Sequence, residues 1–183
     1  MSRRGIPAPA RLLVSVIYRD ETRFAQVLPA IRERFGPVAD TSAAFPFDKT
    51  EYYGKEMGAP LFRRFVVVER LVPRDALAEA KLRAEELEGE FSAGGNRTVN
   101  IDPGLLTEEN FLLATGKNYS HRVYLRDGVF ADLTLIYRKS GYEALPWTYP
   151  DLASEEIRAF LGCARERMRE ARKAGTEGTA CPG

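Results

Sequence analysis

The strongest constraint on the fold of this chain is the order in which strand-like and helical patterns follow one another. An apolar run at residues 11–18 predicts a buried strand, and residues 61–72 predict a longer one centred on the letters FVVV. Between them a helix is predicted after Asp20, because its apolar residues are spaced three or four apart: Phe24, Val27, Leu28, Ile31 and Phe35.

Local signals predict where these elements begin and end. Pro29 lies inside the first helix and predicts a kink or a break, and Gly36-Pro37 predicts the end of that helix. A weaker strand is predicted over residues 38–45. Pro73 predicts the start of a second helix, which is expected to end at Gly89. The apolar face of this helix consists of Leu77, Ala80, Ala84 and Leu87.

A short strand over residues 98–101, closed by Pro103-Gly104, completes the order β-α-β-β-α-β. That is the order of the ferredoxin-like fold. Three further strands are predicted at 111–115, 121–126 and 129–137. A last helix is predicted over 154–173, with an apolar face made by Ile157, Phe160, Leu161, Ala164 and Met168. We therefore expect an α+β protein with a ferredoxin-like core extended by a β-hairpin, a mainly antiparallel sheet and packed helices.

Length and composition bound the organisation and the partners of the chain. Its 183 residues, 44% of them hydrophobic, suit one sizeable core, so we expect a flexible 1–10, a single domain over 11–173 and a disordered tail at 174–183. The net charge of +1 lacks the basic surplus of a nucleic-acid-binding protein. The apolar residues 12–17 are too few for a signal peptide or a membrane span. Cys163 and Cys181 form neither metal-ligand spacing nor a disulfide framework, which favours the cytoplasm.

The segment from residue 97 to residue 137 is the richest candidate for a functional site. Polar groups inside strands are costly unless they are paired or functional. The segment contains the lone histidine, His121, within runs that otherwise resemble strands, together with Arg97, Asn100, Asp102, Lys117, Arg122 and Asp132. The pattern indicates a site without naming its reaction.

The dipeptide Asp127-Gly128 predicts a two-residue hairpin turn. Counting outward from this turn places Val123 opposite Asp132 and His121 opposite Thr134. His121 and Asp132 then become diagonal neighbours on one face. A carboxylate at that distance can orient an imidazole and raise its basicity, which suits a general base or a metal ligand. A structural hydrogen bond at the end of a strand is the alternative.

The other polar residues also admit two interpretations each. Asp102 could ligate a metal or accept a hydrogen bond from a substrate hydroxyl, or could join Asn100 in ordinary turn chemistry ahead of Pro-Gly. Lys117 could contact a phosphate or be solvated in a turn, and no P-loop motif occurs in the chain. The single histidine excludes a multi-histidine metal site and leaves a mixed His/Asp/Asn site open. The sequence names no cofactor.

Several long strings of this sequence resemble a bacterial family catalogued as domain of unknown function 4416. The resemblance covers residues 11–165, and some members of the family carry the label GTP-binding protein. The strings are FPFDKTEYYGKEMG, NRTVNIDPG, LATGKNYSHRVYL, FADLTL and WTYPD. The family pattern has positions matching Thr50, Tyr52, Tyr53, Glu56, Arg97, Asn100, Asp102, Lys117, His121, Arg122, Trp147 and Asp151. The chain departs from it at Leu105, where tyrosine is usual, at Asp132, where glutamate is common, and at Leu152.

Two hypotheses follow. In the first, the protein binds a small anionic metabolite or nucleotide, as a hydrolase, a transferase or a binding protein: Arg97, Asn100, Lys117 and Arg122 hold the ligand, and His121, Asp132 and Asp102 carry the chemistry. In the second, the protein is a non-catalytic interaction or regulatory module whose partner surface is the aromatic segment 45–57. Convergence of the polar residues on one solvent-connected pocket would favour the first hypothesis.

Overall fold

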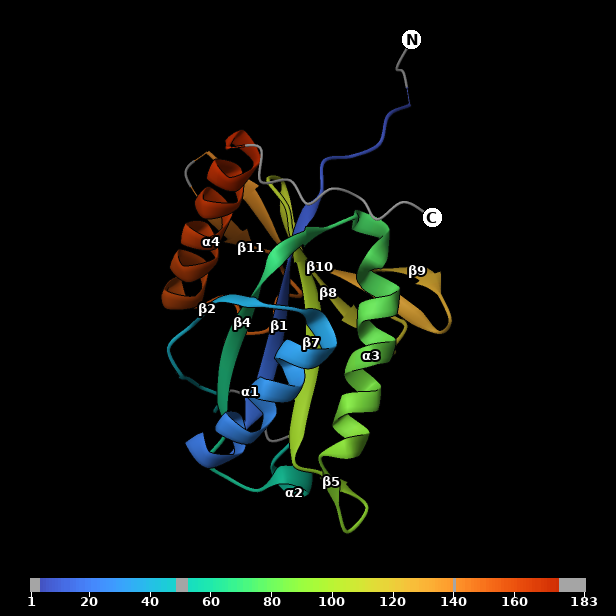
Figure 1. Ribbon diagram of the computed structural model, residues 1–183, viewed down its shortest axis with the longest axis vertical. Helices are drawn as coiled ribbons and strands as arrows, with labels where there is room; N and C mark the ends of the chain where they lie inside the picture. Colours follow the sequence, from blue (N-terminus) through green and yellow to red (C-terminus); the bar gives the residue numbers. More distant parts are fainter. Residues whose placement is uncertain (1–3, 49–52, 140, 175–183) are drawn as a thin grey trace.

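The computed structural model describes residues 4–48, 53–139 and 141–174, and its central element is an antiparallel nine-stranded sheet. The strand order is β11-β10-β8-β7-β1-β4-β2, with β3 paired to β4 and β9 paired to β10 (Figure 1). A separate pair, β5 (Ser92–Ala93) and β6 (Asn96–Arg97), forms a small hairpin. The strands of the large sheet are β1 (Ala10–Tyr18), β2 (Val38–Thr41), β3 (Phe45–Pro46), β4 (Phe62–Val72), β7 (Val99–Leu106), β8 (Asn110–Thr115), β9 (Arg122–Arg126), β10 (Val129–Arg138) and β11 (Gly141–Ala144).

Three long helices cover the two faces of this sheet (Figure 1). Helices α1 (Glu21–Phe35) and α3 (Leu77–Glu90) pack on the face that carries Val14 and Val16 of β1. Helix α4 (Glu155–Lys173) packs on the opposite face against Leu13 and Phe65. Alternate residues of β1 thus belong to two separate hydrophobic clusters, because successive side chains of a strand point to opposite faces. The remaining helical elements are short: α2 (Gly54–Met57) and a 3₁₀ turn over Arg74–Ala76. No helix among the described residues is long and apolar enough to span a bilayer.

The ends of the first two long helices differ in part from the sequence predictions. The side chain of Asp20 accepts a hydrogen bond from the backbone N–H of Arg23 at 2.9 Å, so the predicted cap is confirmed. Helix α1 runs unbroken through Pro29, because burial of its apolar face offsets the lost hydrogen bond, and it ends at Gly36 with φ +103°. The predicted stop at Gly89 is wrong: α3 includes this glycine, at an exposed position where the cost of glycine is modest.

The predicted end of the fourth strand at Pro103-Gly104 is also wrong. Strand β7 continues through both residues to Leu106. Pro103 is tolerated because, in the described register, β7 pairs with β8 from Gly104 onward and leaves the preceding residues unpaired on that side. Gly104 allows the two strands to approach, since a Cβ there would lie 2.6 Å from the carbonyl oxygen of Leu112. The dipeptide therefore marks the place where the sheet opens.

The β9–β10 hairpin forms at the predicted turn but with a different register. Asp127 and Gly128 have φ angles of 52° and 77°, as a tight hairpin turn requires. Beyond the first pair, Leu125 is an extra residue on β9, so Asp132 lies opposite Arg122. The counted pairing of Val123 with Asp132 is therefore wrong by one residue.

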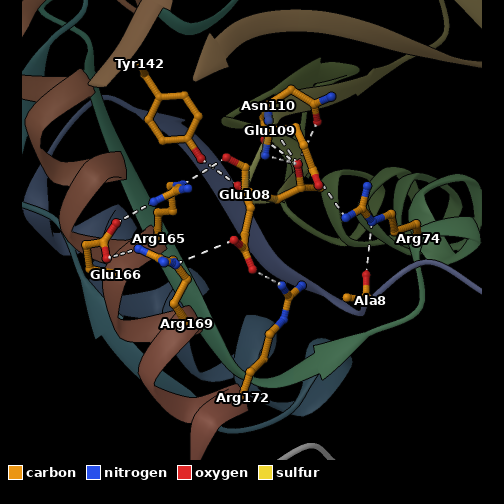
Figure 2. A network of polar contacts seen from close by, with 11 residues as sticks. Ala8, Arg74, Glu108, Glu109, Asn110, Tyr142, Arg165, Glu166, Arg169 and Arg172 are labelled. Carbon is orange, nitrogen blue, oxygen red and sulfur yellow. Dashed lines mark hydrogen bonds and ion pairs between the residues drawn. The ribbon is translucent and has the colours of Figure 1, made fainter. Parts of the chain in front are cut away.

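Helix α4 is attached to the turn between β7 and β8 by arginines (Figure 2). The predicted range of this helix is confirmed, and three of its arginines contact Glu108 in the turn: Arg165, Arg169 and Arg172. Arg165 Nε donates to the carbonyl oxygen of Glu108 at 2.9 Å, and Arg172 Nη1 donates to the Glu108 carboxylate at 2.9 Å. The hydroxyl of Tyr142 donates to the carbonyl oxygen of Thr107 in the same turn at 2.8 Å. These contacts hold α4 beside the sheet.

Candidate functional site

A pocket of about 500 Å³ lies where the sheet opens between β7 and the end of β8. Asn100 and Asp102 line it from the half of β7 that is not paired with β8. Thr115 at the end of β8 and the following residues Gly116 and Lys117 line it from the other side. Lys81 of α3 reaches it from one face of the sheet, while Tyr149 contributes from the loop before α4. The pocket thus exists because two neighbouring strands separate, which exposes edge positions that a continuous sheet would pair.

The pocket brings together all of the predicted site residues except one. Its lining includes Arg97, Asn100, Asp102, Lys117, Arg122 and Asp132. His121 is absent from the described lining. The aromatic segment proposed as a partner surface contributes to the same pocket through Phe47 and Tyr53, and its residues 49–52 lie outside the described part of the chain.

One wall of the pocket is a continuous chain of polar contacts. Glu56 of α2 accepts two hydrogen bonds from the guanidinium of Arg97, at 2.9 and 2.8 Å, and one from its backbone N–H at 3.0 Å. Arg97 Nη1 donates to Asn100 Oδ1 at 3.0 Å, and Asn100 Nδ2 donates to Asp102 Oδ2 at 2.6 Å. Lys81 Nζ closes the chain on Asp102 Oδ1 at 2.9 Å. The side chains of this wall are therefore held in fixed orientations.

The facing wall is organised around Asp132. Arg122 Nε donates to Asp132 Oδ2 at 2.8 Å, and Arg122 Nη1 donates to the carbonyl oxygen of Lys117 at 3.0 Å. His121 Nε2 lies 3.4 Å from the same carboxylate oxygen, and its ring stacks on Trp147 with centroids 4.9 Å apart. The His121 side chain is 10% exposed. The expected meeting of His121 and Asp132 occurs, but the histidine precedes β9 and touches the site through Asp132.

A buried ion pair between Arg63 of β4 and Asp151, which precedes α4, supports the pocket from a third side. Arg63 Nε donates to Asp151 Oδ2 at 2.7 Å, and the side chains of both residues are almost fully buried. The same guanidinium contacts the hydroxyl of Ser15 and lies 5.1 Å from the ring centroid of Phe47. Removing one member of such a pair would leave an uncompensated charge in a dry environment. The pair therefore fixes the position of Arg63 at the pocket.

Electrostatics distinguishes the carboxyl groups of the site. Hydrogen bonds from the side chain and backbone of Arg97 lower the pKa of Glu56 to about 2, and the same hydrogen bonds raise the pKa of Arg97. Burial raises the pKa of Glu88, which also lines the pocket. Burial disfavours the charged form of Lys81, but the neighbouring carboxylates outweigh it and the pKa of Lys81 is raised. Burial thus favours the protonated form of the Glu88 carboxyl.

Sequence reasoning missed three of these residues, and two of them had a readable signal. Lys81 and Glu88 lie four and eleven positions after Leu77, so they interrupt the apolar face of α3. Arg63 had no such signal, because β4 also contains Arg64, Glu69 and Arg70. Among the described residues, no cluster of three or more His, Cys, Asp or Glu side chains could hold a metal ion.

The fold and the pocket together define an α+β protein whose sheet opens around a polar, charge-paired cavity. The chain belongs to the family described as domain of unknown function (DUF4416), whose model matches residues 8–168. The resemblance seen in the sequence is thereby confirmed. No curated protein and no solved structure matches the chain. Because the family description names no activity, the chemistry of the pocket must carry any functional conclusion.

Proposed function

We propose that this pocket binds a small anionic metabolite or nucleotide. The observation that supports the proposal is the convergence of cationic side chains from separate elements on one cavity large enough for such a ligand. These side chains are Arg63, Lys81, Arg97, Lys117 and Arg122. Arginine and lysine are the usual binding groups for phosphate and carboxylate.

The carboxylates beside these cations shape the ligand that the pocket would select. Lys81 and Arg122 already pair with Asp102 and Asp132, so an anion alone would have to compete with fixed protein charges. A ligand that also offers hydroxyl or amino donors to these carboxylates would satisfy both members of each pair. The pocket therefore favours a molecule with both an anionic group and hydrogen-bond donors over a simple ion.

If the protein is an enzyme, hydrolysis or group transfer on such a ligand is the reaction class that we propose. Glu88 is the best candidate for moving a proton, since burial raises the pKa of its carboxyl. Asp102 would orient a ligand hydroxyl, and His121 would position Asp132 rather than contact the ligand. In this proposal Glu88 moves the proton, whereas the sequence prediction gave the role of the base to His121.

A thermal-melting screen tests the binding proposal. Purified protein is melted with a panel of phosphates, nucleotides and carboxylates, each beside an uncharged analogue. We expect at least one anionic compound to raise the melting temperature, because a ligand at about 100 times its Kd adds roughly 2.7 kcal/mol of stability. Arg122→Gln should reduce that shift.

Arg83→Gln is the matched control, since Arg83 lies on the exposed side of α3 and pairs with Glu79 outside the pocket. The proposal fails if no compound raises the melting temperature. It also fails if Arg122→Gln and the control respond equally to every compound that does.

A second candidate function is a non-catalytic interaction module, and the apolar surface of β9 favours it. Val123, Tyr124 and Leu125 are exposed to 67%, 58% and 39% on a strand that pairs with β10 on one side. Exposed apolar edge strands tend to pair with another chain. Val123→Lys should abolish association in light scattering or cross-linking without changing the response to small ligands.

A separate proposal concerns the fold. We infer that β1, α1, β2, β4, α3 and β7 form a ferredoxin-like core, and that β8 to β11 extend it. Supporting this are the strand order β7-β1-β4-β2 and its antiparallel pairings, together with two helices on one face. Removal of residues 107–174 leaves the core without half of its cover, so limited proteolysis of the full chain is the better test. A ferredoxin-like core should resist cleavage within residues 10–48 and 53–106.

A further inference from the structure

A second cavity of about 300 Å³ adjoins the first at Arg97. Arg97 lines both cavities, and its partner Glu56 lines the smaller one. A single ion pair therefore stands between the two spaces. The rest of the smaller cavity comes from the start of α1, the end of α2 and the β5–β6 hairpin, including Arg19, Asp20, Arg23 and Asn96.

Two of the cations that line the smaller cavity have no partner within the described part of the chain. Among the described residues, no hydrogen bond or ion pair involves the guanidinium groups of Arg19 and Arg23. The nearby carboxylates have other roles: Asp20 Oδ1 accepts from the backbone N–H of Arg23, and Glu56 pairs with Arg97. Glu21 accepts from the Tyr18 hydroxyl at 2.9 Å and pairs with Arg64. The cavity thus has a local excess of positive charge.

Arg19 is also held beside the boundary between the cavities. A Cβ at Gly58 would lie 3.6 Å from the Nη1 atom of Arg19, so the guanidinium packs over this glycine. Gly58 has φ +78° and ends α2, the short helix that carries Glu56. The backbone conformation that glycine permits here therefore leaves room for Arg19 next to the ion pair.

We infer that the smaller cavity is a phosphate subsite, and that the ligand of the proposed site is a phosphorylated metabolite that reaches across Arg97. Arg19 and Arg23 bind the phosphoryl group, and the remainder of the molecule lies beside Asn100 and Asp102 in the larger cavity. Two guanidinium groups can meet several oxygens of one phosphoryl group at once. This inference rests on the proposed function for the larger pocket, but its anion-binding half can be tested separately.

The test uses inorganic phosphate as the probe, with the full-length protein. Phosphate is titrated at constant ionic strength, and binding is followed by thermal melting and by line broadening in ³¹P NMR. We expect saturable binding that the double variant Arg19→Gln/Arg23→Gln weakens roughly a hundredfold, at about tenfold for each lost charge-assisted contact. Lys81→Gln, in the larger cavity, is compared with it to show which of the two cavities holds the anion.

The double variant Arg32→Gln/Arg83→Gln is the control, because it removes the same net charge from exposed positions. Melting without phosphate verifies that each variant is folded. Binding that survives in Arg19→Gln/Arg23→Gln, or that falls equally in the control, overturns the subsite. Loss in Lys81→Gln alone places the anion in the larger cavity, which overturns the subsite and keeps the proposed function. Absence of phosphate binding by the unaltered protein also overturns it, while the metabolite screen still judges the larger pocket.

Discussion

Lys81 Nζ lies 2.9 Å from Asp102 Oδ1 and thereby joins α3 to the half of β7 that is not paired with β8. The Lys81 side chain is 7% exposed and the Asp102 side chain 23%. In a continuous sheet this part of β7 would pair with β8. The ion pair instead forms where β7 and β8 separate. This separation removes strand pairing from the sheet and also creates the pocket.

Loss of this ion pair should destabilise the unliganded protein. Lys81→Met leaves Asp102 without its cation and removes one of the cations near the buried Glu88, and we expect a cost of roughly 1–3 kcal/mol in the free energy of unfolding. Urea denaturation measures it. Arg83→Met, on the exposed side of the same helix, should cost less than about 0.5 kcal/mol. Equal costs for the two variants would contradict a structural role for the Lys81 contact.

Acid should weaken the protein through Glu56. The pKa of Glu56 is about 2 in the folded protein and 4.5 in the unfolded reference. The unfolded chain therefore binds more protons at this carboxyl between these values, so its stabilising contribution is present above about pH 4.5 and is lost as the pH falls toward 2. Glu56→Gln should flatten the dependence of the melting temperature on pH in this range. Glu33→Gln, at an exposed position of α1, is the control, and an equal flattening there would refute the assignment.

Gly104 should be intolerant of a side chain. In Gly104→Ala the new Cβ would lie 2.6 Å from the Leu112 carbonyl oxygen and 2.8 Å from the Phe111 ring, and the backbone atom cannot move without disturbing β8. We expect a loss of roughly 1–3 kcal/mol. Gly89→Ala has no atom within 4 Å of its Cβ and should instead stabilise α3 by up to about 1 kcal/mol. Chemical denaturation measures the free energy of unfolding of both variants. An unchanged free energy in Gly104→Ala would contradict the close approach of the two strands.

His121 should matter for stability more than for ligand contact. Its ring stacks on Trp147 and lies against Asp132 outside the described pocket lining. His121→Ala should therefore lower the free energy of unfolding by about 1–3 kcal/mol, from lost packing and stacking. His121→Phe keeps an aromatic ring on Trp147 and should recover part of it. Retained apo stability with complete loss of ligand response in His121→Ala would restore the histidine as a direct site residue.

Much of the fold could be predicted because its signals are local. The periodicity of α1 and α4, the cap at Asp20 and the turn at Asp127-Gly128 depend on residues within a few positions of one another. The wrong predictions concern local sequence signals that are compatible with more than one structure. Pro103-Gly104 is typical of a turn, but here the glycine serves close strand packing. The bulge at Leu125 inserts one residue, and every pair counted beyond it is shifted.

The sequence by itself determined which residue types are present in the polar segment and that they are costly to bury. Only the tertiary structure decided which of them meet, because the contacts join residues far apart in the chain: Glu56 with Arg97, Lys81 with Asp102, and Arg63 with Asp151. The strength of an ion pair depends on the distance between the two charges and on their burial, and neither quantity can be read from the local sequence. For the same reason His121 could be singled out as unusual in the sequence, whereas its place behind Asp132 follows from the register of β9 and the packing of Trp147.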